Sequence, residues 1–340
     1  MDKKFIVGVI GAGRIGAIHI ENLLKTIPRV ELKTVADIKL DSHLKQWATE
    51  IGIPNLTEDA NEIFNDPEIN AVIIASSTDT HVKFIQQAAK VNKHIFCEKP
   101  IDIDLKRTKE TLKIVEDAGI KLMVGFNRRF DHNFKRIHDA VISGQIGKPQ
   151  IIKITSRDPA PPPIEYIKIS GGIFIDMTIH DWDMARYQAG SEVEEVFATG
   201  DVLIDPEIGE AGDIDTAVAI LKFKNGAIGI IDNSRQAIYG YDQRVEVFGS
   251  EGCAIAENDT PNTVRIYNDE NINSDKIAYF FLERYMDSYI SELQHFFYCL
   301  ETDQVPSPNG QDAVQDLLVA LAAQKSFKEN RPIKISEVDL

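Results

Sequence analysis

Asp176 and His180 are the first residues whose types and spacing could carry chemistry. They lie four positions apart, after the pair Gly171 and Gly172 and a short apolar run, so a helix that begins at Asp176 would place both side chains on one face. An imidazole beside a carboxylate is a common general base near neutral pH, because the carboxylate fixes the ring tautomer and stabilises the imidazolium. The alternative is structural, with Asp176 as a helix N-cap and His180 on the surface.

Lys99 is a second candidate, because it follows a short apolar run and is held by Pro100. Its ammonium could hydrogen-bond a substrate hydroxyl and stabilise the alkoxide that develops as a hydride leaves. The alternative is a lysine that points into solvent. A cis Lys99–Pro100 peptide bond would suit a tight turn, but the sequence does not decide that geometry.

A glycine-rich motif near the start of the chain indicates what would accept the hydride. The apolar run 5–10 leads into a G-x-G-x-x-G motif followed by a helical apolar pattern, and the motif consists of Gly11, Ala12, Gly13, Arg14, Ile15 and Gly16. Its first glycine permits the turn, the second lets the backbone approach a pyrophosphate, and the third lets the helix pack on the strand. The motif therefore predicts a dinucleotide-binding site.

Asp37 closes a second strand-like run, at close to the ~20-residue spacing expected for the acid that holds the adenosine ribose hydroxyls. A carboxylate there repels a 2′-phosphate, so NAD is favoured over NADP. Arg14 and Lys39 are nearby cations that leave the strictness of this preference open. The structural alternative is a glycine turn followed by a solvent-exposed aspartate.

Strand-like and helix-like stretches alternate through the first third of the chain, which predicts a parallel sheet covered on both faces. The strands are expected at 5–10, 31–37, 71–75, 94–97 and 121–125. Ligands bind at the carboxyl ends of such strands. Polar segments follow three of the strands and are candidates for contacts: Ser76-Ser77-Thr78 with His81 behind it, Glu98-Lys99-Pro100, and Phe126-Asn127-Arg128-Arg129. At Ser76 to Thr78, helix capping and cofactor contact are compatible.

The pattern changes after residue 124, which predicts a nucleotide-binding domain at 1–124 and a second domain at 125–340. Alternating strands are expected at 151–156, 193–200, 215–223, 227–233, 244–248, 253–257 and 264–267. Their short connections favour a mostly antiparallel, open sheet. Asn225-Gly226 between two of the strands predicts a type I′ hairpin turn. The helices expected within 284–329 could pack back on the first domain.

The composition of the 340 residues, 43% hydrophobic and 26% charged, is that of a globular protein of two ordinary domains. The formal net charge of −16 argues against nucleic acid or an anionic membrane as partner. No apolar run approaches the ~20 residues that span a bilayer, and no signal peptide is expected. The cysteines, Cys97, Cys253 and Cys299, form neither a disulfide framework nor a metal motif, which favours a reducing cytoplasm.

Together these motifs resemble the Gfo/Idh/MocA oxidoreductase family, and within it the inositol dehydrogenase branch. The general family motifs are G-A-G-R-I-G at 11–16, the acid Asp37 and E-K-P at 98–100. The motifs of the branch are G-F-N-R-R-F at 125–130, S-R-D-P-A-P-P-P at 156–163, G-G-I-F-I-D-M-T-I-H-D-W-D at 171–183 and Y-G-Y-D-Q-R-V-E-V-F-G at 239–249. The resemblance spans nearly the whole chain. It implies an α/β protein with a doubly wound N-terminal Rossmann domain and a C-terminal α+β domain. The open sheet of that second domain commonly mediates oligomers, so a homotetramer or dimer is expected.

The resemblance also implies roles for individual residues. Lys99, Asp176 and His180 would be catalytic: His180 would take the hydroxyl proton, Asp176 would support His180, and Lys99 would bind the same oxygen. The implied NAD contacts are Gly11, Ala12, Gly13, Arg14, Ile15, Gly16, Asp37, Ser76, Ser77, Thr78, His81, Glu98, Lys99 and Asn127. The implied polyol contacts are Lys99, Asn127, Arg128, Arg157, Asp176, His180, Asp183, Tyr239 and Tyr241. No metal is needed, because an imidazole and an ammonium manage the proton and the charge.

The implied reaction is the NAD-dependent oxidation of myo-inositol at C2 to scyllo-inosose. The same chemistry on scyllo-inositol, D-chiro-inositol or a pyranose such as glucose is the alternative, and the sequence decides neither the stereoisomer nor the physiological direction. A different class, a non-catalytic regulator that senses the nucleotide, would be expected to lack the lysine or the histidine. Both Lys99 and His180 are present.

Overall fold

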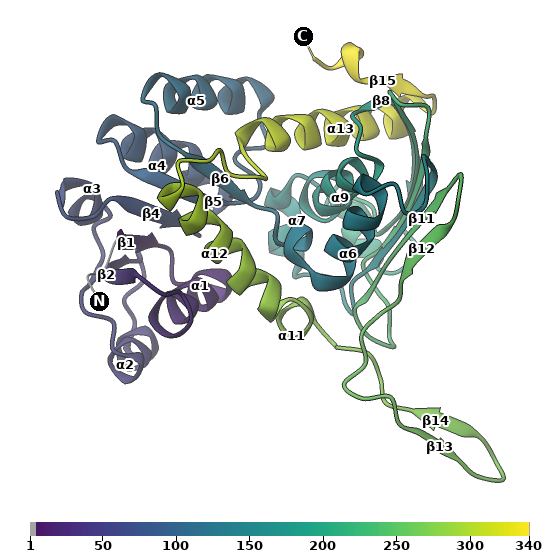
Figure 1. Cartoon of the computed structure of the whole chain (residues 1–340), viewed down its shortest axis with the longest axis horizontal. Coiled ribbons are helices and arrows are strands. Elements are labelled where there is room, and N and C mark those ends of the chain that lie inside the picture. Colours follow the sequence, from purple (N-terminus) through teal and green to yellow (C-terminus); the bar gives the residue numbers. More distant parts are fainter. Residues whose placement is uncertain (1–4, 340) are drawn as a thin grey trace. The chain divides into compact units, whose positions relative to one another are not determined.

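The computed structural model describes residues 5–339 and divides into two compact units (Figure 1). Unit 1 comprises Met1–Phe130 and Asp287–Val314, and unit 2 comprises Asp131–Met286 and Gln315–Leu340. Within residues 5–339 no helix has the length and apolar character that crossing a membrane requires.

Unit 1 is built on a six-stranded sheet in which all the strands are parallel. The order across the sheet is β3 (Leu56–Thr57), β2 (Val30–Ala36), β1 (Phe5–Ile10), β4 (Ala71–Ile74), β5 (His94–Glu98) and β6 (Leu122–Gly125). This is the doubly wound order 3-2-1-4-5-6, in which ligands bind where the strand order reverses, between β1 and β4. The predicted Rossmann sheet is therefore confirmed.

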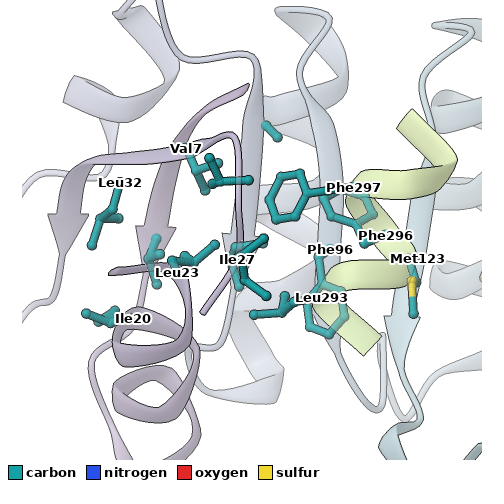
Figure 2. Close-up of a cluster of buried hydrophobic side chains, with 14 of the residues drawn as sticks. Val7, Ile20, Leu23, Ile27, Leu32, Phe96, Met123, Leu293, Phe296 and Phe297 are labelled. Carbon is teal, nitrogen blue, oxygen red and sulfur yellow. The ribbon is translucent and has the colours of Figure 1, made fainter. Parts of the chain in front are cut away.

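Helices connect these strands: α1 (Arg14–Lys25), α2 (Ser42–Ile51), α3 (Asn61–Asn65), α4 (Thr78–Lys90) and α5 (Leu105–Asp117). The 3-10 helix η1 (Asn127–Phe130) follows β6. Farther along the chain, α12 (Met286–Glu301) adds Leu293, Phe296 and Phe297 to the core that also contains Phe96 of β5 (Figure 2). The buried strands of this core are continuous apolar runs, as expected for parallel strands covered on both faces.

Unit 2 contains a seven-stranded sheet in which only the β7–β10 pair is parallel. The order is β12 (Cys253–Ala256), β11 (Asp242–Gly249), β7 (Pro149–Arg157), β10 (Ile228–Ser234), β9 (Thr216–Phe223), β8 (Val193–Asp201) and β15 (Ile333–Lys334). The prediction of a mostly antiparallel sheet is confirmed. Along β9 buried and exposed residues alternate, so one face of the sheet lies in the core and the other is open.

The remaining elements of unit 2 are mainly helical: α6 (His132–Ile142), α7 (Ile164–Ser170), α8 (Ile173–Asp176), α9 (Ile179–Ala189), α10 (Pro206–Glu210), α11 (Phe281–Arg284) and the 3-10 helix η2 (Ile335–Glu337). The helix α13 (Gly310–Glu329) crosses from unit 1 into unit 2 along the chain. A hairpin of β13 (Arg265–Tyr267) and β14 (Ile272–Ser274), exposed along its length, projects from the seven-stranded sheet (Figure 1).

The turn between β9 and β10 corrects a local prediction. The hairpin forms as expected, but Asn225 lacks the positive φ that a type I′ turn requires, and only Gly226 has one, at 90°. The amide of Gly226 donates to the carbonyl of Phe223 (2.9 Å), and the amide of Phe223 donates to the carbonyl of Ala227 (3.0 Å). This is the longer turn in which a glycine of positive φ follows a type I turn and forms a bulge.

Candidate active site

The structure gives a different physical reason for a glycine at each of the three motif positions. Gly11 has a φ of 96°, and a Cβ there would lie 2.6 Å from the backbone oxygen of Ala75. A Cβ on Gly16 would lie 2.0 Å from the oxygen of Gly11, so α1 could not approach the loop. By contrast, no described atom lies within 4 Å of the Cβ position at Gly13. The protein itself does not need a glycine at 13, and this open space fits a ligand that lies against the backbone.

The N-terminus of α1 is suited to an anion. Gly13 is its N-cap, so no side chain caps the helix, and none of the described residues in its first turn is acidic. The amides at this end and the positive end of the helix dipole therefore remain available, as a pyrophosphate requires.

Asp37 follows β2 and is bound to this loop. Its Oδ2 accepts from the amide of Ala12 (2.7 Å) and its Oδ1 from the amide of Lys39 (2.8 Å). The carboxylate thus faces the glycine loop at the strand order reversal, where the ribose of a dinucleotide would lie. This geometry fits NAD.

A cavity of about 270 Å³ joins these features within unit 1. Of the predicted contacts, Gly11, Gly13, Asp37, Ser76 and Ser77 line it. The sequence analysis missed the remaining side chains of the lining: Ile38, Glu58, Ala60, Thr80 and Phe84 among them. Ile38 is the clearest of these, because it is 85% exposed directly after Asp37. The sequence showed only that an isoleucine follows Asp37, and its exposure became visible in the structure.

The other predicted cofactor residues of the first helices lie nearby or are buried. Ala12 contacts Asp37, whereas Arg14, Ile15 and Gly16 begin α1, and Thr78 begins α4. The buried His81 has its Nδ1 2.8 Å from the carbonyl oxygen of Pro100 and its Nε2 3.0 Å from that of Ser76. His81 therefore connects Ser76, which lines the cavity, with Pro100, which follows Lys99. Contact of His81 with NAD stays a prediction.

Lys99 lies just past β5, half-buried, and the Lys99–Pro100 peptide bond is cis. Glu98 before it is paired with His19 of α1, with 2.7 Å between Oε1 and Nε2. In η1, the buried Asn127 donates to Ser288 (3.3 Å), and Arg128 is also buried. Both residues follow β6, at the carboxyl edge of the sheet where Lys99 also lies.

In unit 2, Asp176 does not begin a helix, which corrects the sequence prediction. Gly171 and Gly172 have positive φ values (88° and 83°), and the helix α8 begins directly after them. Asp176 is the last residue of α8. The amide of Thr178 then donates to Ile173, five residues back, so the α-helical pattern stops and α9 begins with Thr178 as its N-cap. Asp176 and His180 thus lie on either side of a helix break.

Exposure nevertheless singles out these two residues. From Ile173 to Arg186 every residue is buried except Asp176 and His180, which are half-buried. In a segment otherwise committed to the core, the carboxylate and the imidazole are the groups that a substrate could reach. A surface helix would instead expose a whole polar face.

Partners distant in sequence hold Asp176 in place. Its Oδ1 accepts from the hydroxyl of Tyr166 (2.7 Å) and its Oδ2 from the fully buried Arg235 (3.3 Å). Arg235 also bonds Asp213 (3.1 Å), whose other oxygen accepts from the amide of Ile173 at the start of α8. Sequence reasoning missed Tyr166, Asp213 and Arg235, because no local pattern marks these partners, which are separated by 10 to 59 positions.

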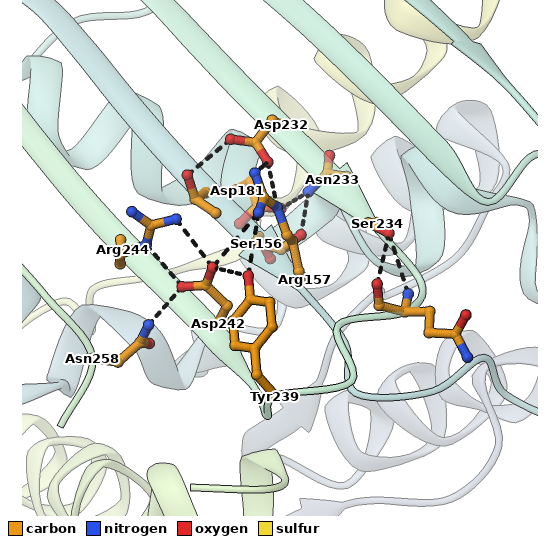
Figure 3. A network of polar contacts seen from close by, with 12 residues as sticks. Ser156, Arg157, Asp181, Asp232, Asn233, Ser234, Tyr239, Asp242, Arg244 and Asn258 are labelled. Atoms are coloured by element: carbon orange, nitrogen blue, oxygen red, sulfur yellow. Dashed lines mark hydrogen bonds and ion pairs between the residues drawn. The ribbon is translucent and has the colours of Figure 1, made fainter. Parts of the chain in front are cut away.

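Three strands place a polar network at one end of the open sheet face (Figure 3). Arg157 at the end of β7 contacts Asp232 of β10 through Nε (2.7 Å) and the hydroxyl of Tyr239 through Nη1 (3.2 Å). The Tyr239 hydroxyl donates to Asp242 (2.6 Å), which also accepts from Arg244. Burial and this bond to Asp242 raise the pKa of Tyr239. Burial alone would raise the pKa of Asp242, but its hydrogen bonds from Arg244, Tyr239 and Asn258 outweigh burial and lower it.

Strand alternation separates this network from the helix-covered face. Ser156, next to Arg157, points the other way, and so does Asn233, which donates to Asp181 of α9 (2.8 Å). Among the other predicted polyol contacts, Asp183 of α9 is buried, and Tyr241 is buried edge-on against Tyr285. Contact of Arg157 and Tyr239 with substrate stays a prediction, because Asp232 and Asp242, to which they bond, lie on the open face.

The matches with known proteins cover both units. Residues 5–126 match the family described as an oxidoreductase family with an NAD-binding Rossmann fold, and residues 134–255 match the GFO/IDH/MocA C-terminal domain. Myo-inositol 2-dehydrogenase of Thermotoga maritima is 50% identical over 98% of this chain and 99% of its own length. The scyllo-inositol 2-dehydrogenase (NAD(+)) of Bacillus subtilis is 38% identical over 98% of this chain and 97% of its own.

A solved structure shows the same fold. The scyllo-inositol dehydrogenase of Lactobacillus casei, with bound NAD(H) and scyllo-inositol, is 29% identical and superposes with a TM-score of 0.91, over 98% of this chain and 100% of that one. Fold, glycine loop and acid define an NAD-dependent oxidoreductase with a Rossmann domain. The chain belongs to the Gfo/Idh/MocA oxidoreductase family.

Proposed function

We propose that this protein oxidises myo-inositol at C2 to scyllo-inosose, with NAD as the hydride acceptor. The observation that carries the proposal is the half-buried pair Asp176 and His180 within a buried segment. Support comes from the relatives that are named inositol dehydrogenases and match nearly end to end.

The proposed mechanism assigns one task to each of three residues. His180 accepts the proton of the reacting hydroxyl, while the hydrogen on the same carbon leaves as hydride and a carbonyl forms. NAD, when bound, supplies the acceptor for that hydride. Lys99 donates a hydrogen bond to the reacting oxygen and stabilises its developing negative charge. Asp176, held by Tyr166 and Arg235, orients His180 and stabilises the imidazolium.

Neutral polyols suit such side chains, because each hydroxyl both donates and accepts hydrogen bonds. The proposed further contacts are Asn127, Arg128, Arg157, Asp183, Tyr239 and Tyr241. Proposed contacts with NAD are the cavity lining around Gly13 and Asp37, together with Glu98 and Asn127 at the carboxyl edge of the sheet. The reduced cysteines Cys97, Cys253 and Cys299 are compatible with a cytoplasmic location, which we also propose.

The substrate is tested by initial rates of NADH formation with myo-inositol, scyllo-inositol, D-chiro-inositol and glucose. We expect the highest kcat/KM with myo-inositol, and mass spectrometry of the product should show the 2-keto compound. A parallel series with NADP measures the cofactor preference. A higher kcat/KM with another polyol would overturn the substrate assignment. Absence of turnover with all four, despite NAD binding, would instead favour the regulator.

We also propose that the open face of the unit 2 sheet pairs with a second copy of this chain, giving a dimer or tetramer. The exposed apolar residues of this face are Val218, Ile220, Ile228, Ile230, Phe248 and Ile255. Ile220 and Ile230 lie directly opposite each other on β9 and β10, and Ile151 of β7 pairs with both Ile228 and Phe248, so the patch extends across these strands. The Arg157 network at one end provides a polar rim. A monomer rarely exposes such a patch, and the commonest arrangement that covers one is a twofold dimer, in which the same patch of both copies meets.

Ile220→Glu should shift the protein from an oligomer to a single chain in size-exclusion chromatography with light scattering, because it buries a charge at the centre of the patch. Ile142→Glu is the matched control, since Ile142 is 66% exposed and is the last residue of the helix α6 rather than part of a sheet strand. The control should keep the mass of the wild type. A monomeric wild type, or an Ile220→Glu protein of unchanged mass, would contradict the proposed interface.

A further inference from the structure

A buried cluster in unit 1 contains a carboxyl group that the proposed mechanism does not use. Glu292 lies on α12 and is fully buried, and it directly precedes Leu293, which belongs to the hydrophobic core of unit 1 (Figure 2). One side-chain atom each of Glu292, Glu98 and His19 lie within 4.8 Å of one another. Neither oxygen of Glu292 accepts a hydrogen bond from a donor among residues 5–339. A buried carboxylate in that state is strongly unfavourable.

Aromatic rings and backbone pack around the cluster, and only 13% of the Glu98 side chain is exposed. The rings of Phe96 and Tyr289 lie edge-on to His19, at centroid distances of 5.1 and 5.9 Å. The backbone of β6 closes another side, because a Cβ on Gly125 would lie 2.9 Å from Oε2 of Glu98. His19 donates from Nε2 to Glu98, and its Nδ1 has no partner among the described residues. The favourable way to place two carboxyls here is to let them share a proton.

We propose that Glu292 is a neutral carboxylic acid that donates its proton to Glu98 and thereby acts as a positioning residue for Lys99. Glu98 is then a single negative charge held by two donors, Nε2 of His19 on α1 and the hydroxyl of Glu292 on α12. Burial, and next the negative charge of Glu98, raise the pKa of Glu292 well above its usual range, which is the direction that favours the neutral acid.

The consequence for Lys99 follows from its place in the chain. Glu98 is the last residue of β5, so its anchors fix the backbone just before Lys99. His81 fixes the backbone just after it, through the carbonyl of Pro100 (2.8 Å). The backbone that bears the Lys99 ammonium is therefore fixed on both sides, at Glu98 and at Pro100. The inference rests on the proposed role of Lys99 in the reaction.

A bound metal is the competing explanation, since two carboxylates and an imidazole could ligate a divalent cation. The ligating histidine of a metal site ordinarily donates from its second nitrogen to a carboxylate or a carbonyl. Nδ1 of His19 makes no such bond among the described residues, and its Nε2 is already 2.7 Å from Glu98. These observations favour the shared proton.

The test compares two isosteric variants of the full-length protein. Glu292→Gln keeps a neutral hydrogen-bond donor, so its kcat should stay within about twofold of the wild type. Glu292→Met removes the donor and should lower kcat about 10-fold, the effect of one lost hydrogen bond to a charged group, with little change in the KM for the polyol. Leu293→Met, a volume-conserving change at the next buried position, is the control and should be nearly neutral.

Infrared spectroscopy and metal analysis provide readouts that do not depend on activity. At neutral pH the wild type should show the carbonyl stretch of a buried protonated acid, and Glu292→Gln should lack this band. Neither protein should contain stoichiometric metal. A missing band in the wild type, or one divalent metal per chain, would contradict the proposal. So would a Glu292→Gln enzyme as slow as a folded Glu292→Met, or a Glu292→Met enzyme with the kcat of the wild type. Should Glu292→Met not fold, the band and the kcat of Glu292→Gln decide. A Lys99→Met enzyme with normal kcat would instead contradict the proposed function, and the infrared band would persist.

Discussion

His180→Ala should lower kcat for inositol oxidation by about 10²–10⁴-fold, the usual effect of losing a general base. Without the imidazole the hydroxyl proton must go to water while the hydride leaves, so the transition state loses its proton acceptor. NAD binding should survive, because the cavity around Gly13 and Asp37 belongs to unit 1 whereas His180 belongs to unit 2. Steady-state rates and NAD titration by intrinsic fluorescence measure the two properties separately.

A control and a pH profile make this prediction specific. His43→Ala removes an exposed histidine of α2 and should leave both properties unchanged. The decline of kcat at low pH, which reports protonation of the base in the wild-type complex, should disappear in His180→Ala. Turnover close to that of the wild type, or an unchanged pH profile, would show that another group takes the proton.

Replacing Asp37 should change cofactor binding rather than the chemical step. Asp37→Ala is expected to weaken NAD by about 10- to 100-fold, the effect of losing charge-assisted hydrogen bonds. The same change should narrow the preference for NAD over NADP, because the carboxylate no longer repels a 2′-phosphate. Dissociation constants for both cofactors, measured by calorimetry, give the ratio directly.

Asp37→Asn separates the effect of the carboxylate charge on cofactor binding from its effect on the structure of the glycine loop. Its side-chain oxygen can still accept from the amide of Ala12, which is bonded to Oδ2 of Asp37 at 2.7 Å in the wild type. We expect Asp37→Asn to bind NADP better while losing less NAD affinity than Asp37→Ala. An unchanged ratio of the two dissociation constants in both variants would mean that a different residue distinguishes the cofactors.

The Rossmann sheet and its glycine loop were predictable because both depend on local patterns. Strands buried on both faces appear as apolar runs such as 71–75, and β4 occupies Ala71–Ile74. Gly11 and Gly16 are required by close backbone approaches within one strand–turn–helix unit, and the spacing of the motif records that unit. Asp37 was found for the same reason, since it ends the next strand of the pattern.

The helix break at Asp176 and the turn at Asn225 were predicted incorrectly because distant contacts and small backbone differences decide them. Asp213, which accepts from the amide of Ile173, fixes where α8 starts from 40 residues away. At Asn225 the pattern correctly predicts a hairpin, but two turn lengths share the Asn-Gly signal and differ in the φ of one residue. Local sequence does not distinguish such alternatives.

The amino-acid sequence alone thus determined the fold class through its periodicity and the dinucleotide loop through the spacing of its glycines. It also contained the residue types able to take a proton and to stabilise an alkoxide, which is a matter of side-chain chemistry. Only the tertiary structure decided which side chains surround them. It placed Arg235 and Tyr166 on Asp176, left Asp176 and His180 accessible in a buried segment, and put Glu292 beside Glu98. These contacts join residues from ten to almost two hundred positions apart, and the burial that gives them their energies exists only after the chain has folded.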